Sequence, residues 1–287
     1  MIDPATRTIL VSGATGQQGS AVARHLLDKG FQVRVLTRDP EQEIARALAA
    51  RGAEIVAGNF DDRESLDRAL DGAYGAYSVQ NFGKSGVEGE IRQGKAFAEA
   101  ARDAGIEHFV YSSVGGAERG TGIAHFDSKW EIEEHIRKLG LPATILRPVF
   151  FMDNWMNFKD AIVGGKLPQP LDPGTPLQQI AVDDIGAFAA LAFANPDQWI
   201  GRATEIAGDD LTMTEIAETF GRVLGCKVEY VQVPWGAFEE QAGGEMVSMY
   251  RWFQSDGYEA EIKALRKEYP QLTRLEPFLR ARDWASK

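Results

Sequence analysis

The segment TILVSGATGQQGSAVARHLLDK, residues 8–29, decides the fold class. A short run of β-branched and apolar residues leads into a glycine-rich turn, and a helical pattern follows from Gly19 to Lys29. Gly13 allows a tight turn, Gly16 lets the backbone approach a pyrophosphate, and Gly19 allows close packing of the helix, whose free N–H groups attract the anion. The pattern predicts a dinucleotide site, and the alternative is a glycine-rich turn without a ligand.

Strands and helices continue to alternate as far as residue 150. Apolar strand patterns such as QVRVLT (residues 32–37) and HFVYSS (residues 108–113) are separated by helical patterns. The predicted helices cover residues 19–29, 41–51, 63–70, 90–104 and 128–139. Alternation of this length predicts parallel βαβ units with right-handed crossovers. We therefore expect an α/β fold: a doubly wound parallel Rossmann sheet with a smaller, mostly helical C-terminal cap.

The residues after the second predicted strand, LTRDP (residues 36–40), indicate which dinucleotide is bound. An acidic side chain about 20 residues after the glycine-rich loop would hold a ribose 2′-OH. Arg38 comes first, and a guanidinium there can pair with a 2′-phosphate, so we predict NADP(H) over NAD. Two alternatives stay open: Asp39 could point at the ribose, and Arg38 could be a solvated charge at a strand end.

The pattern changes after Pro148, where a stretch rich in proline and glycine begins. We predict an NADP-binding domain over residues 1–150, with residues 178–207 returning to it. Two segments in this part, LQQIAV (residues 177–182) and ATEIAG (residues 203–208), are expected to be strands of the main sheet. Residues 151–177 and 208–287 are predicted to form the substrate and cap region. A ligand should bind outside the carboxyl ends of the strands.

Composition excludes several classes of protein. The 287 residues carry a formal net charge of −11, which disfavours partners such as nucleic acid or a membrane surface. The single cysteine, Cys226, excludes an internal disulfide framework, and we expect it to be a small buried hydrophobe. His25, His108 and His135 lie apart without partners at ligand spacing, so no metal is predicted. The first residues do not resemble a signal peptide, and a cytoplasmic location is expected.

Further pocket residues follow the ends of other predicted strands. The cofactor is expected to contact loop residues and strand-end residues, namely Gly13, Thr15, Gly16, Gln17, Gln18, Gly19, Arg38, Asn59, Phe60, Asp61, Gln80, Asn81, Pro148 and Phe150. The predicted substrate wall consists of Phe82, Phe151, Asn154 and Trp155. Such an aromatic pocket suits a flat, apolar carbonyl compound or quinone better than a sugar. The alternatives are that Asp61 only caps the following helix and that the aromatics only fill the core.

These motifs together resemble the NmrA-like family, atypical members of the short-chain dehydrogenase/reductase superfamily. The resemblance covers essentially the whole chain and includes GATGQQGSAV, VRVLTRDP, GAEIVAGNFDD and AHFDSKWEIEEHIRKLGLPATILRP. It is closest to a branch whose members bind NADPH and act as redox sensors, while other branches resemble quinone and dye reductases. The resemblance implies the Rossmann fold and the cofactor, but it does not decide whether the protein is an enzyme.

The resemblance also indicates candidate catalytic residues. In the wider superfamily a Tyr-x-x-x-Lys pair, assisted by serine, moves the proton, and both side chains lie on one helical face. Lys129 matches the lysine, Ser112 or Ser113 could supply the serine, and His125 stands where the tyrosine would be. Lys129 is expected to bind the nicotinamide ribose. For His125 two roles stay open: a catalytic one, orienting a carbonyl or relaying a proton, and a structural one.

Two functions follow from this resemblance. The first is an NADPH-dependent oxidoreductase of small carbonyl, quinone or related apolar substrates, in which protons come from solvent, His125 or a nearby hydroxyl. The second is a non-catalytic sensor of the NADPH/NADP ratio that acts through a homodimer or a regulatory protein partner. The sequence favours the oxidoreductase slightly because of the aromatic pocket.

Overall fold

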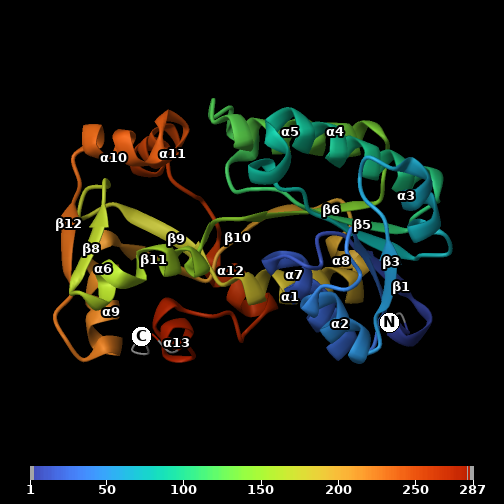
Figure 1. The fold of residues 1–287 in the computed structure, drawn as a ribbon, viewed down its shortest axis with the longest axis horizontal. Helices are drawn as coiled ribbons and strands as arrows, with labels where there is room; N and C mark the ends of the chain where they lie inside the picture. The colour runs from blue at the N-terminus through green and yellow to red at the C-terminus, as the bar shows by residue number, and fades with distance from the viewer. Residues whose placement is uncertain (1–2, 283, 285–287) are drawn as a thin grey trace. The chain divides into compact units, whose positions relative to one another are not determined.

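The chain folds into two compact units, which Figure 1 shows in a computed structural model that describes residues 3–282 and 284. The larger unit runs to Glu118 and adds Ala124–Arg147 and Val182–Thr204. The smaller unit comprises Arg119–Ile123, Pro148–Ala181 and the chain from Glu205 onward. Which unit binds cofactor and which binds substrate remains a prediction.

The larger unit is built on a parallel sheet. Within the described residues this sheet has seven strands in the order β10-β6-β5-β4-β1-β2-β3, and each neighbouring pair from β3 to β6 is parallel. The strands are β1 (Thr8–Val11), β2 (Gln32–Thr37), β3 (Glu54–Ala57), β4 (Gly75–Ser78), β5 (His108–Ser112), β6 (Ala143–Pro148) and β10 (Ala203–Ile206). The strand order reverses between β1 and β4, which confirms the predicted doubly wound sheet.

Helices cover both faces of this sheet (Figure 1). One face carries α3 (Arg63–Leu70), α4 (Phe82–Asp103) and α5 (Ala124–Lys138), and the other carries α1 (Gln17–Asp28), α2 (Glu43–Ala50), α7 (Val182–Ala194) and α8 (Pro196–Trp199). The described residues also form the short 3-10 helices η1 (Pro4–Thr6), η2 (Ala117–Arg119) and η3 (Met152–Phe158). Strands covered on both faces must be apolar on both, and β4 and β5 are buried at every position.

One predicted helix begins earlier than expected. The sequence predicted a start at Glu90, but α4 begins at Phe82, after Asn81 caps it by accepting the N–H of Gly83 at 2.9 Å. Gly86 breaks the helical backbone with φ 71° and ψ 171°, a conformation that favours glycine. The glycine-rich segment therefore forms a kinked first turn and not a loop.

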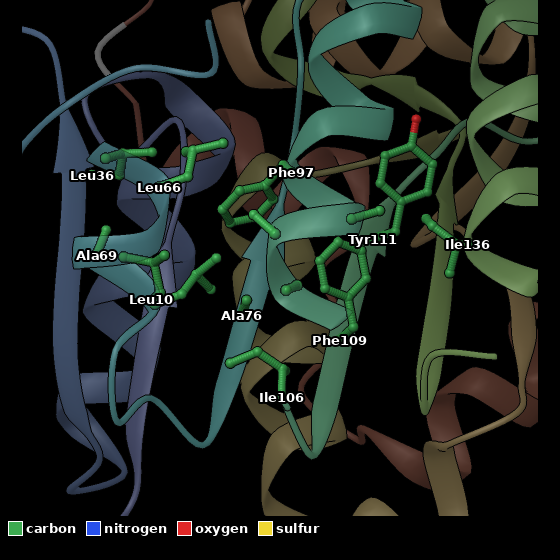
Figure 2. Close-up of a cluster of buried hydrophobic side chains, with 14 of the residues drawn as sticks. Leu10, Leu36, Leu66, Ala69, Ala76, Phe97, Ile106, Phe109, Tyr111 and Ile136 are labelled. Atoms are coloured by element: carbon green, nitrogen blue, oxygen red, sulfur yellow. The ribbon is translucent and has the colours of Figure 1, made fainter. Parts of the chain in front are cut away.

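The core under α3, α4 and α5 is a continuous apolar cluster, shown in Figure 2. Leu10, Ala76 and Phe109 come from three neighbouring strands of the sheet. Phe97 of α4 is fully buried and lies 5.9 Å from the ring of Phe109. Truncating such a side chain to alanine costs about 3–5 kcal/mol of stability. This cluster fixes α4 and α5 against the sheet, so side chains at their ends have defined positions.

The smaller unit has two small sheets and most of the C-terminal helices. Its strands are β7 (Phe150–Phe151), β8 (Lys166–Gln169), β9 (Pro176–Ile180), β11 (Asp209–Thr212) and β12 (Glu229–Gln232). Its helices are α6 (Lys159–Val163), α9 (Met213–Leu224), α10 (Trp235–Ala242), α11 (Gly244–Ser255), α12 (Ile262–Glu268) and α13 (Leu275–Arg280). The predominance of helices after Thr212 agrees with the predicted helical C-terminal region.

The prediction that LQQIAV joins the main sheet is wrong. Its strand, β9, pairs antiparallel with β11 and parallel with β7, whereas β10 does join the main sheet as expected. Successive side chains of a strand point to opposite faces, so the adjacent Gln178 and Gln179 give both faces an amide. That pattern suits a small sheet better than one covered on both faces by apolar helices.

Cys226 also departs from expectation, because it is exposed and not a buried hydrophobe. It follows Gly225, which ends α9 in the left-handed conformation with φ 68° and turns the chain outward. The aromatics of α11 are core residues of the smaller unit: Tyr250, Trp252 and Phe253 are each at most 8% exposed.

No described helix combines the length and the apolar character needed to cross a bilayer. The part of the chain that the structure describes also contains no group of three or more His, Cys, Asp or Glu side chains arranged to hold a metal ion.

Candidate functional site

The loop between β1 and α1 has the backbone geometry that the glycines predicted. Gly13 has a φ of 62°, in the left-handed region. A Cβ on Gly19 would lie 2.3 Å from the carbonyl oxygen of Gly13, so only glycine fits between the helix and the turn. Gly16 is the N-cap of α1 and contributes no side-chain capping bond, which leaves the first N–H groups of this helix available to an anion.

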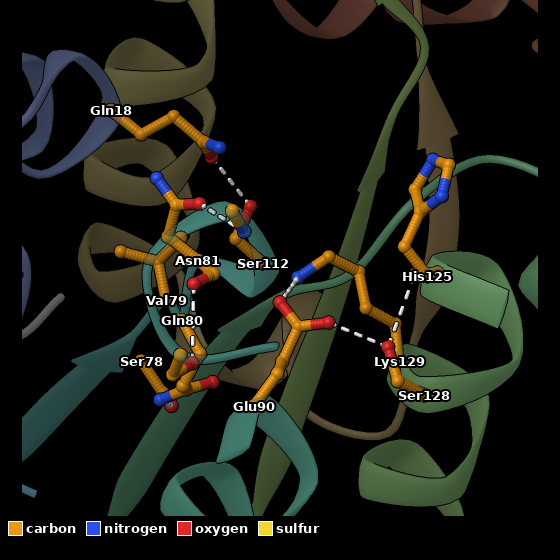
Figure 3. A network of polar contacts seen from close by, with 12 residues as sticks. Gln18, Ser78, Val79, Gln80, Asn81, Glu90, Ser112, His125, Ser128 and Lys129 are labelled. Atoms are coloured by element: carbon orange, nitrogen blue, oxygen red, sulfur yellow. Dashed lines mark hydrogen bonds and ion pairs between the residues drawn. The ribbon is translucent and has the colours of Figure 1, made fainter. Parts of the chain in front are cut away.

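Gln18 and Ser112 meet at the carboxyl edge of the sheet (Figure 3). The hydroxyl of Ser112 donates to Gln18 Oε1 at 2.6 Å, and the hydroxyl of Tyr77 donates to the same oxygen at 3.3 Å. Ser112 and Tyr77 are completely buried, and burial raises the pKa of Tyr77. The predicted serine is therefore bonded to the cofactor loop's helix, and its proton is already engaged.

Lys129 is ion-paired with a residue that the sequence analysis did not single out. Its ammonium lies 3.0 Å from Glu90 Oε1, and the hydroxyl of Ser128 donates to Glu90 Oε2 at 2.5 Å. The Glu90 side chain is fully buried and that of Lys129 is 12% exposed. The ammonium also lies 5.9 Å from the ring centre of Tyr111. Lys129 is thus a nearly buried cation with a fixed counter-charge.

His125 lies in the first turn of α5 and is 8% exposed. Its ring stacks on Phe82, with centroids 4.5 Å apart and an interplanar angle of 14°. In Figure 3 the imidazole and the ammonium of Lys129 point in different directions, although the two residues are four positions apart on one helix. Phe82, predicted as part of a substrate wall, is therefore also the platform that orients His125.

Arg38 follows β2 as an exposed side chain, and it has no polar partner among the described residues. The neighbouring Asp39 is occupied by the local turn, where its carboxylate accepts the N–H of Glu41 at 3.0 Å. The arrangement leaves a guanidinium available at this strand end and engages the carboxylate elsewhere. The pairing of Arg38 with a 2′-phosphate stays a prediction, as does the alternative in which Asp39 holds a ribose hydroxyl.

The alternative reading of Asp61 as a helix cap is wrong. Asp62 caps α3 by accepting the N–H of Ser65 at 3.2 Å, whereas Asp61 pairs with Arg92 at 3.0 Å. Asp62 is adjacent to the first helical residue, which is where the free N–H groups can be reached. Asn59 accepts the N–H of Asp61 at 2.8 Å and shapes this turn.

Two further predicted cofactor contacts turn partly inward. Phe60 packs edge-on against Phe97 at 5.5 Å, so part of its ring belongs to the core. Gln80 is 5% exposed and donates to Ser78 at 3.0 Å, while its carbonyl oxygen has no partner within the described residues. The adjacent Asn81 is exposed and caps α4. Gln80 therefore presents an unsatisfied acceptor after β4, the strand beside the point where the strand order reverses.

The predicted residues that follow β6 belong to the smaller unit. Pro148 and Phe150 are buried, and Phe150 packs against Trp155 with centroids 5.1 Å apart. Trp155 is 1% exposed and donates through Nε1 to Gln179 at 2.6 Å. Phe151 and Asn154 are half-buried. The packing of Trp155 matches the alternative reading in which this aromatic fills a core.

The missed residue, Glu90, did leave a signal in the sequence. Glu90, Gly94, Ala98 and Ala101 recur at helical spacing, and all four are buried in α4. A glutamate on an otherwise small-residue face is an unusual buried polar group, which demands a partner. The sequence alone could not name that partner, because Lys129 lies 39 residues away along the chain.

Comparison with known proteins identifies the family. The model of the NmrA-like family matches residues 5–279. An NmrA-like family domain-containing oxidoreductase, FrzB, from Cladobotryum sp is 31% identical over 266 residues, which cover 82% of this chain and 79% of the relative. This protein is a member of the NmrA-like family.

Two further matches are a curated relative and a solved structure. An NAD(P)H azoreductase from Xenophilus azovorans is 30% identical, with 84% of this chain and 81% of that protein covered. The crystal structure of NmrA, a negative transcriptional regulator, in complex with NADP superimposes with a TM-score of 0.82 at 23% identity, over 98% of this chain and 100% of that one. At this identity the likeness to NmrA is one of fold.

Proposed function

We propose that this NmrA-like protein is an NADPH-dependent oxidoreductase that reduces small, apolar carbonyl compounds, quinones or related conjugated acceptors. The observation that carries the proposal is the cradle between β1 and α1, where a Cβ on Gly19 would overlap the backbone of Gly13. Relatives at 30–31% identity that are named as oxidoreductases and an azoreductase support the reaction class.

The residues of the cradle fit a dinucleotide. The uncapped N–H groups at the start of α1 would bind the pyrophosphate, since they combine free donors with the positive end of the helix dipole. The unpaired guanidinium of Arg38 would bind the 2′-phosphate that distinguishes NADP from NAD. NADPH, when bound, supplies a hydride.

Lys129 would hold the nicotinamide ribose. An ammonium has three N–H donors, of which one is directed at Glu90, so two remain for ribose hydroxyls. Its charge would also favour the reduced, negatively charged oxygen that forms on a carbonyl or quinone acceptor. The same side chain therefore serves binding and, where a substrate oxygen comes close, catalysis.

The missing tyrosine restricts the source of the proton. Ser112 has committed its hydroxyl proton to Gln18, and burial raises the pKa of Tyr111 well above its ordinary value, which disfavours ionisation of that phenol. His125 sits at the start of α5 with its ring held by Phe82. We assign the proton to His125 or to a water that it orients.

The test follows NADPH oxidation by the purified protein against a panel of quinones, aldehydes, enones, imines and azo compounds. Lys129→Met and His125→Asn are measured in parallel, with NADPH affinity determined for each. Turnover that His125→Asn reduces by about 100-fold without loss of NADPH affinity would support the enzyme and its proton donor. Tight NADPH binding without turnover of any compound would contradict the oxidoreductase and favour the sensor.

The proposal includes a cytoplasmic location and a homodimer. The exposed Cys226 thiol suits a reducing compartment, where it stays free. Sedimentation of the purified protein with and without NADPH tests the dimer, and a monomer under both conditions would contradict it.

A further inference from the structure

We propose that Glu90 is the positioning residue for Lys129: its buried carboxylate fixes the ammonium in the direction required for the nicotinamide ribose. The inference rests on the proposed function, because it assumes that Lys129 contacts NADPH. It assigns a role in cofactor binding to a residue of α4 that lies outside the glycine-rich loop and outside the His-x-x-x-Lys motif of α5.

Burial makes this carboxylate dependent on its partners. Glu90 is fully buried, and a buried ionised group is costly unless its lone pairs and charge are matched. One oxygen is bound by the ammonium of Lys129 at 3.0 Å and the other by the hydroxyl of Ser128 at 2.5 Å. Ser128 and Lys129 are consecutive residues of α5, so the carboxylate binds this helix at one position.

The spacing between α4 and α5 holds the pair in place. Gly94 lies one turn after Glu90, and a Cβ there would meet Ile132 Cδ1 at 2.5 Å. Ile132 in turn lies three residues after Lys129 on α5. The absence of a side chain at Gly94 therefore lets the two helices approach closely beside the ion pair.

A lysine side chain without such a partner has many rotamers. The bond to Glu90, drawn in Figure 3, selects one of them and uses one of the three N–H donors of the ammonium. The face of the Tyr111 ring, 5.9 Å from the ammonium, limits movement in another direction. Without the Glu90 carboxylate, the Lys129 ammonium would be nearly buried but free to adopt several conformations. Binding of the ribose would then have to fix one of them.

A double-mutant cycle on NADPH affinity tests the inference. Four proteins are compared by fluorescence titration with NADPH: the wild type, Glu90→Gln, Lys129→Met and the double variant. We expect each single substitution to weaken binding about tenfold, since a hydrogen bond to a charged group is of that order. The double variant should bind no more weakly than Lys129→Met, because Glu90 acts only through the lysine. A double variant that binds NADPH about 100-fold more weakly than the wild type would show independent effects and would overturn the inference.

Glu133→Gln is the matched control. Glu133 is also a fully buried glutamate, lies on α5 and is paired with Arg147 at 2.7 Å. Both Gln variants should lower the thermal midpoint, but only Glu90→Gln should weaken NADPH binding. Glu90→Asp keeps the charge one methylene further away and should recover part of the affinity. Equal affinity losses in the two Gln variants, or no recovery with Asp, would show a merely structural role.

The failures of the two proposals differ in this experiment. If the wild type does not bind NADPH, the proposed function fails and the inference fails with it. If Lys129→Met loses affinity while Glu90→Gln matches the wild type, only the inference fails. The double variant guards against misfolding, because it removes both charges and leaves neither of them buried alone.

Discussion

The β1–α1 loop and the α4–α5 pair contribute to the candidate cofactor site in different ways. In the loop, consecutive residues from Gly13 to Gly19 shape the backbone, and the proposed binding groups are main-chain N–H donors. In the helix pair, two side chains 39 residues apart, Glu90 and Lys129, meet through packing. A backbone site can be read from a local pattern, whereas a side-chain site of this kind depends on how helices pack.

The largest effect is expected from closing the cradle in the loop. In Gly19→Ala the new Cβ would overlap the Gly13 carbonyl, which is backbone and cannot rotate away. We expect NADPH affinity to fall by at least about 100-fold and stability to fall by about 2 kcal/mol, as overpacking does. Titration with NADPH and thermal unfolding measure both.

Gly174→Ala is the control for this substitution. Gly174 has no positive φ, and a Cβ there would meet nothing within 4 Å. It should leave both affinity and stability unchanged. Normal binding by Gly19→Ala would mean that the loop does not hold the pyrophosphate.

A smaller and selective effect is expected at Arg38. Arg38→Ala should weaken NADPH binding by about 30-fold and leave NADH binding unchanged, because only NADPH carries the 2′-phosphate. Arg68→Ala is the control for net charge, because it also removes one exposed arginine but from α3. An NADPH preference that survives in Arg38→Ala would refute the assignment of this residue.

The helix pair can be disturbed without touching either charge. Gly94→Ala puts a methyl group against Ile132 and should push α4 away from α5. We expect a loss of about 1–2 kcal/mol in stability and a several-fold weaker NADPH affinity. Adding Ile132→Val should restore part of both by making room. If Gly94→Ala lowers stability but leaves NADPH affinity unchanged, the Glu90–Lys129 pair does not depend on the spacing of the two helices.

The last prediction concerns His108, at the amino end of β5. Substituting it should not change NADPH affinity, but this residue should make the stability of the protein depend on pH. Burial lowers the pKa of His108 from 6.5 to about 4. Between these values the unfolded chain binds a proton that the folded protein excludes, so stability falls as pH drops from about 6.5 toward 4, by at most about 3 kcal/mol. Unfolding of the wild type and His108→Gln at about pH 7.5 and about pH 5 checks this, and an equal loss in both would contradict it.

The sequence predicted the sheet and the cradle because both follow local rules. Apolar strands alternated with helices, and the glycines of the first loop had defined steric tasks. The predicted start of α3 at residue 63 agrees with the structure, but of the two adjacent aspartates it is Asp62, next to the first helical residue, and not Asp61 that caps the helix.

Features that depend on tertiary packing could not be predicted. The partner of Glu90, the stacking of Phe82 on His125 and the pairing of β9 with β11 all join segments that are distant along the chain. The sequence also misjudged Cys226, since a cysteine looks apolar in isolation while the turn after Gly225 directs it outward. The roles of the predicted site residues in binding and catalysis remain predictions.

The kink at Gly86 has a consequence for how this protein can evolve. It separates the first turn of α4, which carries Phe82, from the continuous helix that carries Glu90. Substitutions ahead of the kink can reshape the surroundings of His125 while the charge on Lys129 stays anchored. Under the proposed function, divergence in acceptor choice can therefore accumulate at residues 82–85, while Glu90 and Lys129 are kept for the cofactor.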